Sequence, residues 1–174
     1  MSSRPESAMK KRQVKPEIRR SLAAIKSPAR RARSADSKTT THSEEETFEL
    51  ARNMARRFRG KEVVLLRGEL GAGKTIFAKG MAAGLGIKSC AQVCSPSFTI
   101  MNIYQARFLI FHFDLYRLEK SADILDLGWE DYLDRGVMIV EWGERVPFTL
   151  EAIRVHIKKG KGDKRIIEVS MPQQ

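Results

Sequence analysis

A strand, a glycine-rich loop and a helix follow one another early in this chain, and this order constrains the fold more than any other feature. The loop, residues 68–75, reads Gly-Glu-Leu-Gly-Ala-Gly-Lys-Thr and fits the pattern G-x-x-x-x-G-K-[ST] in full. Residues 63–66 are an apolar run with β-branched side chains, typical of a buried strand, and residues 76–83 have helical composition. Because the pattern binds phosphate in this context, the sequence predicts a nucleoside triphosphate site.

Each residue type in this loop has a physical role at a phosphate site. The glycines let backbone N–H groups converge on phosphate oxygens, and the helix N-terminus adds partial positive charge. We expect Lys74 to reach the β- and γ-phosphates and the Thr75 hydroxyl to bind Mg²⁺. The candidate nucleotide-binding residues of the loop are Gly71, Ala72, Gly73, Lys74, Thr75 and Ile76. The choice of base stays open, because no guanine motif is present and adenine pockets lack a short signature.

Charge divides the chain into two parts. Residues 1–40 contain twelve Lys and Arg against three Asp and Glu, a net charge of +9, so the other 134 residues contribute only +2 of the total +11. The first part is also poor in aromatic residues. We therefore expect a disordered basic extension over residues 1–40 and one P-loop domain over residues 41–174. The extension fits an organellar transit peptide, a basic bacterial extension or a start codon assigned too early.

Composition also bears on compartment and metal content. No apolar run approaches the ~20 residues of a membrane span, so we expect no membrane partner. Cys90 and Cys94 are the only cysteines, too few for a structural zinc site. Free thiols indicate a reducing compartment, and we expect a cytoplasmic protein unless the extension directs it to an organelle.

The remaining pattern predicts a mixed sheet in an α/β fold. Ser43 with Glu46 is a capping box that begins a helix ending at Gly60. We expect Ser121 to cap a second short helix. The predicted strands are residues 92–94, 99–104 with 108–113 as an antiparallel hairpin, 137–140 as a buried parallel strand, and 153–157 with 166–169 as a closing hairpin.

Two carboxylates follow apolar strands, where ligands of open α/β sheets bind. Asp114 follows residues 108–113, and Glu141 follows residues 137–140. A P-loop enzyme needs an acid there to hold Mg²⁺ or its waters, so one of the pair can hold the metal while the other orients the attacking water. Strand alternation sends Trp142 to the side opposite Glu141.

Two further features lie near these acids. The hydroxyl-rich residues 95–99, fixed by a proline, form either a switch loop that senses the γ-phosphate or a plain turn. We interpret His112 as a packed strand residue.

With these residues in view, the chain closely resembles the TsaE (YjeE) family, the small ATPases of bacterial tRNA threonylcarbamoyladenosine synthesis. The resemblance covers residues 41 to about 170. It rests on the P-loop together with four other motifs, Ser-Glu-Glu-Glu-Thr at 43–47, Ser-Pro-Ser-Phe at 95–98, His-Phe-Asp-Leu-Tyr-Arg-Leu at 112–118 and Val-Glu-Trp at 140–142. The last two are far more specific than the P-loop.

The resemblance implies a function, cofactors and partners. It implies slow, Mg²⁺-dependent ATP hydrolysis that resets a complex of the partner proteins TsaB and TsaD, of which TsaD modifies adenosine 37 of tRNAs reading codons that begin with A. Contact with tRNA would be indirect, through that complex. By position, Lys74 and Thr75 match the phosphate and Mg²⁺ residues, Glu141 matches the metal acid and Asp114 the catalytic, Walker-B-like acid.

Two other positions match the family less directly, and the extension does not match it at all. Glu144 is expected to line the nucleotide site. Ser97 stands where the family usually has Thr, which keeps the switch hydroxyl.

Two other function classes compete with this interpretation. A small-molecule kinase would need an acceptor pocket and usually an arginine-bearing lid, and no lid-like insertion lies between Gly86 and Gly136. A nucleotide-operated binding module would share the P-loop and lack a working carboxylate pair. A nucleic-acid-binding protein led by the basic extension is disfavoured by the +2 charge of the domain and by the lack of a recognition motif.

Overall fold

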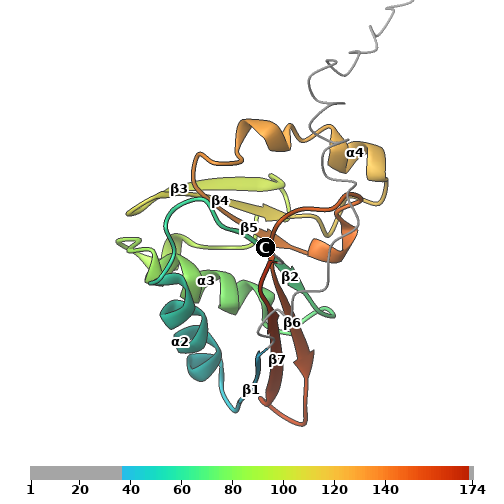
Figure 1. The fold of residues 1–174 in the computed structure, drawn as a ribbon. Helices are drawn as coiled ribbons and strands as arrows, with labels where there is room; N and C mark the ends of the chain where they lie inside the picture. The colour runs from blue at the N-terminus through green and yellow to red at the C-terminus, as the bar shows by residue number, and fades with distance from the viewer. Residues whose placement is uncertain (1–36, 173–174) are drawn as a thin grey trace, which may run out of the picture. The chain divides into compact units, whose positions relative to one another are not determined.

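The computed structural model describes residues 37–172, which form a seven-stranded mixed sheet with helices on both faces (Figure 1). The strand order is β1-β7-β6-β2-β5-β4-β3. The four central strands, β6, β2, β5 and β4, run parallel to one another, and antiparallel pairs close both edges. The predicted α/β fold with a mixed sheet and a C-terminal β-hairpin is confirmed.

The strands are β1 (Ser37–Thr41), β2 (Val63–Arg67), β3 (Met101–Gln105), β4 (Leu109–Asp114), β5 (Val137–Glu141), β6 (Ile153–Lys159) and β7 (Arg165–Ser170). The α-helices are α2 (Glu44–Ala55), α3 (Lys74–Gly84) and α4 (Ser121–Leu125), and short 3-10 turns cover Cys90–Gln92, Trp129–Asp131 and Gly143–Arg145. The β3–β4 and β6–β7 hairpins and the parallel strand β5 were all predicted from the sequence.

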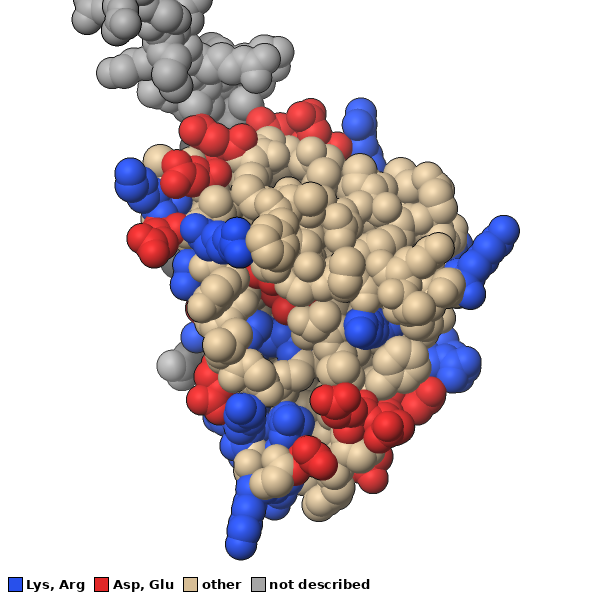
Figure 2. Space-filling model, turned by 180° about the vertical axis from the view of Figure 1, so that it is seen from behind, with Lys and Arg blue, Asp and Glu red and all other residues tan. Residues whose placement is uncertain are grey.

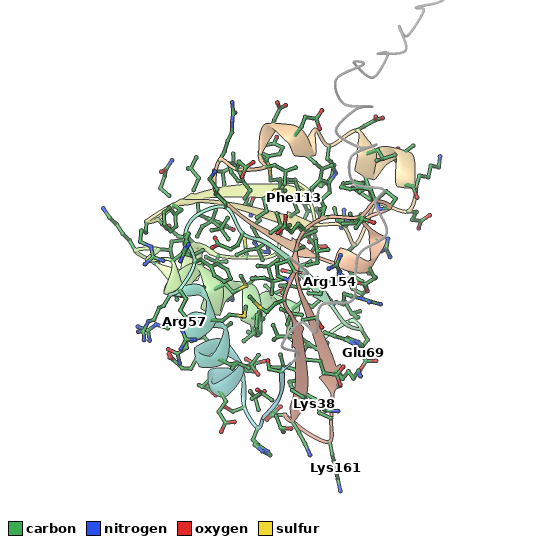
Figure 3. The ribbon with its side chains drawn as sticks, viewed as in Figure 1. Lys38, Arg57, Glu69, Phe113, Arg154 and Lys161 are labelled. Carbon is green, nitrogen blue, oxygen red and sulfur yellow. The ribbon has the colours of Figure 1, made fainter. Side chains whose placement is uncertain are left out.

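The central strands are buried on both faces, which explains their continuous apolar sequences. Alternate side chains enter two separate cores. Val64, Ile110 and Ile139 pack on the side of α2 and α3. Phe113 packs on the opposite side, where its ring stacks on Trp129 at 5.1 Å between centroids (Figure 3). Since residues two apart on a strand share a face, Asp114 and Glu141 lie on the α3 side of the sheet.

Helix α2 begins as the capping box predicts. The Ser43 hydroxyl accepts a hydrogen bond from the Glu46 backbone N–H at 3.1 Å, and the Glu46 carboxylate accepts one from the His42 N–H at 2.7 Å. The helix packs closely on α3, because a Cβ at Gly80 would lie 2.2 Å from the Phe48 carbonyl oxygen. Glycine at this position therefore brings the two helix backbones together and fixes α3 beneath the sheet.

Three local predictions differ from the structure. Residues 92–94 are not a strand: Gln92 ends a 3-10 turn over Cys90–Gln92, and Val93 and Cys94 pair with no strand of the sheet. Ser121 is the first residue of α4 and makes no capping bond. Helix α2 ends at Ala55, five residues before Gly60, where the chain turns toward β2.

Residues 37–40, which the sequence assigned to the extension, form strand β1 together with Thr41. β1 pairs antiparallel with β7, and the buried Thr41 hydroxyl is 2.7 Å from that of Thr47 in α2. A short strand without apolar side chains has little pattern by which it can be predicted from sequence. β1 forms because β7 offers it hydrogen-bonding partners. The remainder of the predicted extension, residues 1–36, lies outside the described residues.

Within residues 37–172, no helix is long and apolar enough to cross a membrane. Seen from behind, this part of the protein has a broad uncharged area, with Lys, Arg, Asp and Glu gathered mainly around its edge (Figure 2).

Candidate nucleotide-binding site

The P-loop connects β2 at the centre of the sheet to the N-terminus of α3. Gly73 is the residue before the helix and has a φ of 105°, in the left-handed region where a side chain would be strained. This turn directs the first backbone N–H groups of α3 out of the helix end, where they can donate to an anion. The glycine therefore allows the turn that anion-binding loops make before a helix.

Lys74 folds back over the loop. Its Nζ donates to the carbonyl oxygens of Gly68 at 2.7 Å and Glu69 at 2.9 Å, and the residue is only 5% exposed. The same Nζ lies 3.7 Å from the centre of the Trp142 ring, a cation–π contact. The ammonium is thus held at the loop by contacts that a phosphate can replace.

Burial lowers the pKa of Lys74, and the charges of nearby acids oppose this effect. Those acids are Glu141, Glu144, Asp114 and Glu69, in decreasing order of effect. Glu144, in the 3-10 turn after β5, is therefore close enough to act on the charge of Lys74. These four acids carry more negative charge than Lys74 alone can balance, so the site can accommodate a further cation.

Glu141, the last residue of β5, contacts the P-loop directly. One carboxylate oxygen, Oε2, accepts a hydrogen bond from the Thr75 hydroxyl at 2.9 Å. The other, Oε1, is 3.0 Å from Nε2 of His112, and both side chains are almost completely buried. The structure thus joins Thr75 and Glu141, the two predicted metal ligands, although 66 residues separate them in the sequence.

Asp114, the last residue of β4, is in register with Glu141 on the adjacent parallel strand. It has its own partners, since the Ser95 hydroxyl donates to Oδ2 and the Tyr116 backbone N–H donates to Oδ1 at 2.9 Å. Asp114 is 4% exposed. The two acids therefore lie side by side, with one bonded to the P-loop and the other to the segment 95–99.

The chemistry of these residues fits a magnesium ion. Mg²⁺ demands octahedral geometry at about 2.0–2.1 Å and uses one or two carboxylates plus substrate phosphates, so adjacent ligand oxygens lie about 2.9 Å apart. The Thr75 hydroxyl and the Glu141 carboxylate, both oxygen ligands of the kind Mg²⁺ uses, lie together in the structure and are hydrogen-bonded to each other at 2.9 Å. Among the described residues, no group of three or more His, Cys, Asp or Glu could hold a metal ion by itself.

The rest of the loop borders a small surface cavity. Gly71, Gly73 and Ile76 line it together with Ser43 at the start of α2 and Arg165 at the start of β7. Arg165 also donates from Nε to the Ala72 carbonyl oxygen at 3.0 Å, which ties the closing hairpin to the P-loop. The cavity therefore lies beside the turn of the P-loop.

Trp142 packs against the core on the face opposite Glu141, as strand alternation predicts. Its φ is 60°, and its ring also lies over the Lys74 ammonium, a contact that the sequence did not predict. Trp142 therefore belongs to the site.

Sequence reasoning also missed functional contacts of three other residues. Ser95 provides a hydroxyl bonded to Asp114. His112 is buried as predicted, but it also contacts Glu141, and Arg165 contacts the loop. The sequence held one signal for the contact between His112 and Glu141. His112 stands two residues before Asp114, and residues two apart on a strand share a face.

The sheet topology and the glycine-rich loop are those of the P-loop NTPase class. The sequence profile of the family described as "Threonylcarbamoyl adenosine biosynthesis protein TsaE" matches residues 41–167. The chain belongs to the TsaE family and thus to the proteins of tRNA threonylcarbamoyladenosine biosynthesis.

Individual proteins similar to this chain support the assignment to this family. The TsaE protein of Rickettsia conorii is 35% identical over 133 residues, which is 75% of this chain and 75% of that protein. The TsaE protein of Bacillus subtilis is 40% identical over 134 residues, 75% of this chain and 82% of that one. The crystal structure of YdiB from Bacillus subtilis superposes with a TM-score of 0.68 at 32% identity, covering 82% of this chain and 89% of that structure.

Proposed function

We propose that this protein binds ATP with Mg²⁺ at the P-loop, hydrolyses it slowly, and acts on a complex of TsaB-like and TsaD-like proteins without carrying out the transfer to tRNA. The contact between the Thr75 hydroxyl and the Glu141 carboxylate, 2.9 Å across the sheet edge, is the observation that carries this proposal. It joins a P-loop hydroxyl to a strand-end acid, the pair that P-loop enzymes use for Mg²⁺. We expect the protein to act in the cytoplasm unless the basic extension directs it to an organelle.

We assign a separate role in ATP binding to each residue of the site. Bound Mg²⁺ would neutralise charge that develops on the β- and γ-phosphates. Lys74 would leave the Gly68 and Glu69 carbonyl oxygens and bind the phosphates, with backbone N–H groups of the loop as further donors. Thr75 and Glu141 would hold the ion.

Asp114 is left to orient the attacking water, because its carboxylate contacts Ser95 and Tyr116 instead of the P-loop. Its bond to Ser95 also connects it to residues 95–99. A γ-phosphate that draws this segment inward would change the position of the acid, which is how switch loops sense a nucleotide. Ser97 would contribute its hydroxyl to the same segment.

Hydrolysis by the protein alone should be slow, because positive charge around the phosphates is incomplete. Arg145 donates to the Leu118 carbonyl oxygen, and Arg165 donates to backbone oxygens that include that of Ala72. Both guanidinium groups are thus directed to backbone carbonyl oxygens in the structure. An arginine supplied by a partner raises rates by about 10³–10⁵ in other P-loop enzymes.

The biochemical test compares ATP and GTP binding by calorimetry, then ATP hydrolysis with and without the TsaB–TsaD complex. Lys74→Ala should weaken ATP binding by about 10- to 100-fold or more, since it removes charge-assisted hydrogen bonds. The circular dichroism spectrum of the variant should stay that of the wild type. Unchanged ATP affinity in the folded variant would overturn the phosphate site, and phosphoryl transfer to a small-molecule acceptor would favour a kinase instead.

The cellular test depletes the protein and measures threonylcarbamoyladenosine in tRNAs by mass spectrometry. We expect unmodified adenosine to accumulate in tRNAs that read codons beginning with A. The Asp114→Asn variant should fail to restore the modification, whereas wild-type protein should restore it. Normal modification after depletion, with no substitute ATPase present, would contradict the assignment.

A further inference from the structure

His112 stands out because it is a polar side chain in the buried centre of an apolar strand. β4 reads Leu-Ile-Phe-His-Phe-Asp from Leu109 to Asp114, and His112 is 1% exposed. A buried imidazole loses its hydrogen bonds with water and needs protein partners in their place. An apolar residue of similar size would fill this position at lower cost. The presence of His112 therefore calls for a contact that only a polar ring can make.

That contact is the one with Glu141. Nε2 of His112 is 3.0 Å from Oε1 of Glu141, and Nδ1 is buried without a hydrogen-bond partner within the part of the chain that the structure describes. Because an ionised carboxylate only accepts hydrogen bonds, Nε2 carries the hydrogen and donates it. Among the described residues, therefore, Glu141 is the one hydrogen-bond partner of the ring, and the ring serves that bond.

The two oxygens of Glu141 have different partners. Oε2 accepts from Thr75, whose hydroxyl is the other proposed metal ligand, whereas Oε1 accepts from His112. When an ion takes the Thr75 hydroxyl, the bond between Thr75 and Glu141 must change, but the bond to His112 need not. His112 is in β4 and Glu141 in the adjacent β5, so the parallel pairing of two strands fixes the distance between them.

We propose that His112 is a positioning residue that orients the Glu141 carboxylate for Mg²⁺ in the nucleotide-bound protein. The inference rests on the proposed function, since it concerns the metal of that site. Partners that hydrogen-bond a ligating group typically change metal affinity by about 10- to 100-fold when they are removed. His112 acts through Glu141 and touches neither nucleotide nor metal.

Two amides provide a matched pair for the test. In His112→Gln the side-chain amide can place a donor near the position of Nε2, whereas in His112→Asn it reaches only the position of Nδ1. Ile139→Val, at the residue in register with His112 on β5, controls for disturbance of the core. His112→Leu removes every donor. ADP affinity is measured by calorimetry in EDTA, and Mn²⁺ affinity of the ADP-bound protein by electron paramagnetic resonance of free Mn²⁺.

We expect His112→Asn and His112→Leu to weaken Mn²⁺ binding by about 10- to 100-fold. Their ADP affinity in EDTA should stay within about twofold of wild type, and His112→Gln should recover most of the Mn²⁺ affinity. If one of the two weakened variants does not fold, the other gives the answer. Wild-type Mn²⁺ affinity in a folded Asn or Leu variant, or an equal loss in Ile139→Val, would overturn the inference. Wild-type protein that binds no ADP would overturn the proposed function, and this inference with it.

Discussion

The ammonium of Lys74 lies 3.7 Å from the centre of the Trp142 ring, so the site holds its principal cation against an aromatic face. The contact depends on the left-handed conformation of Trp142, with a φ of 60°. Such a φ is uncommon for a residue other than glycine. The turn after β5 therefore brings an indole to the P-loop at the position where phosphate would compete for the lysine.

This contact predicts a fluorescence signal for nucleotide binding. ATP should draw the Lys74 ammonium away from the Trp142 ring and change its emission. Trp142→Phe should lose the change while still binding ATP, because a cation–π contact is worth only about 0.5–2 kcal/mol. Trp129→Phe is the control, because Trp129 is buried against the Phe113 ring and its indole N–H donates to the Ile124 carbonyl oxygen, so its surroundings should not change when the ammonium moves. A signal that survives in Trp142→Phe would contradict this prediction.

The pKa of Lys74 predicts how binding depends on pH. Burial lowers this pKa below the usual lysine value of 10.5. Only the protonated amine attracts phosphate, so ATP affinity should be full at neutral pH and fall as pH rises through the lowered pKa. Calorimetry across the alkaline range should place the midpoint below 10.5. Lys74→Met should bind weakly without this fall, and a wild-type midpoint at or above 10.5 would contradict the prediction.

The separate partners of the two acids predict separate defects. Glu141→Gln should bind ATP normally in EDTA and lose the gain in affinity that Mg²⁺ gives, because it removes a charged metal ligand. Asp114→Asn should bind ATP normally with and without Mg²⁺ and lose turnover by about 100-fold or more, the usual effect of a group that positions or activates water. Calorimetry with and without Mg²⁺ measures the binding defect of Glu141→Gln, and phosphate release measures the turnover defect of Asp114→Asn. Unchanged hydrolysis in both variants would make the pair structural only.

Strand β1 predicts where the chain can be shortened. A chain beginning at Ser37 should unfold at the same temperature as the full chain and bind ATP equally well. A chain beginning at His42 loses β1, its pairing with β7 and the bond between Thr41 and Thr47. It should lose stability by about 1 kcal/mol for each hydrogen bond removed. Thermal unfolding compares the two shortened chains. Equal melting temperatures would show that β1 does not contribute to the stability of the domain.

Much of the fold could be predicted from the sequence. The P-loop, the buried run of β5 and the two hairpins all have patterns contained in a few consecutive residues. Helix α2 could be placed from Ser43 and Glu46 in the same way. Strand β1 could not, because its residues carry no apolar pattern and it forms only against β7. Local features are predictable where the backbone conformation follows from neighbouring side chains.

The candidate site was likewise only partly predictable from the sequence. The sequence by itself determined which residues carry chemistry, since Lys74 and Thr75 belong to a local motif and Asp114 and Glu141 end apolar strands. Only the tertiary structure decided their partners. Glu141 meets Thr75 across 66 residues and His112 across 29, and both contacts follow from the order and register of the strands. Register is set by the packing of the whole sheet against its helices, so no short segment of sequence contains it.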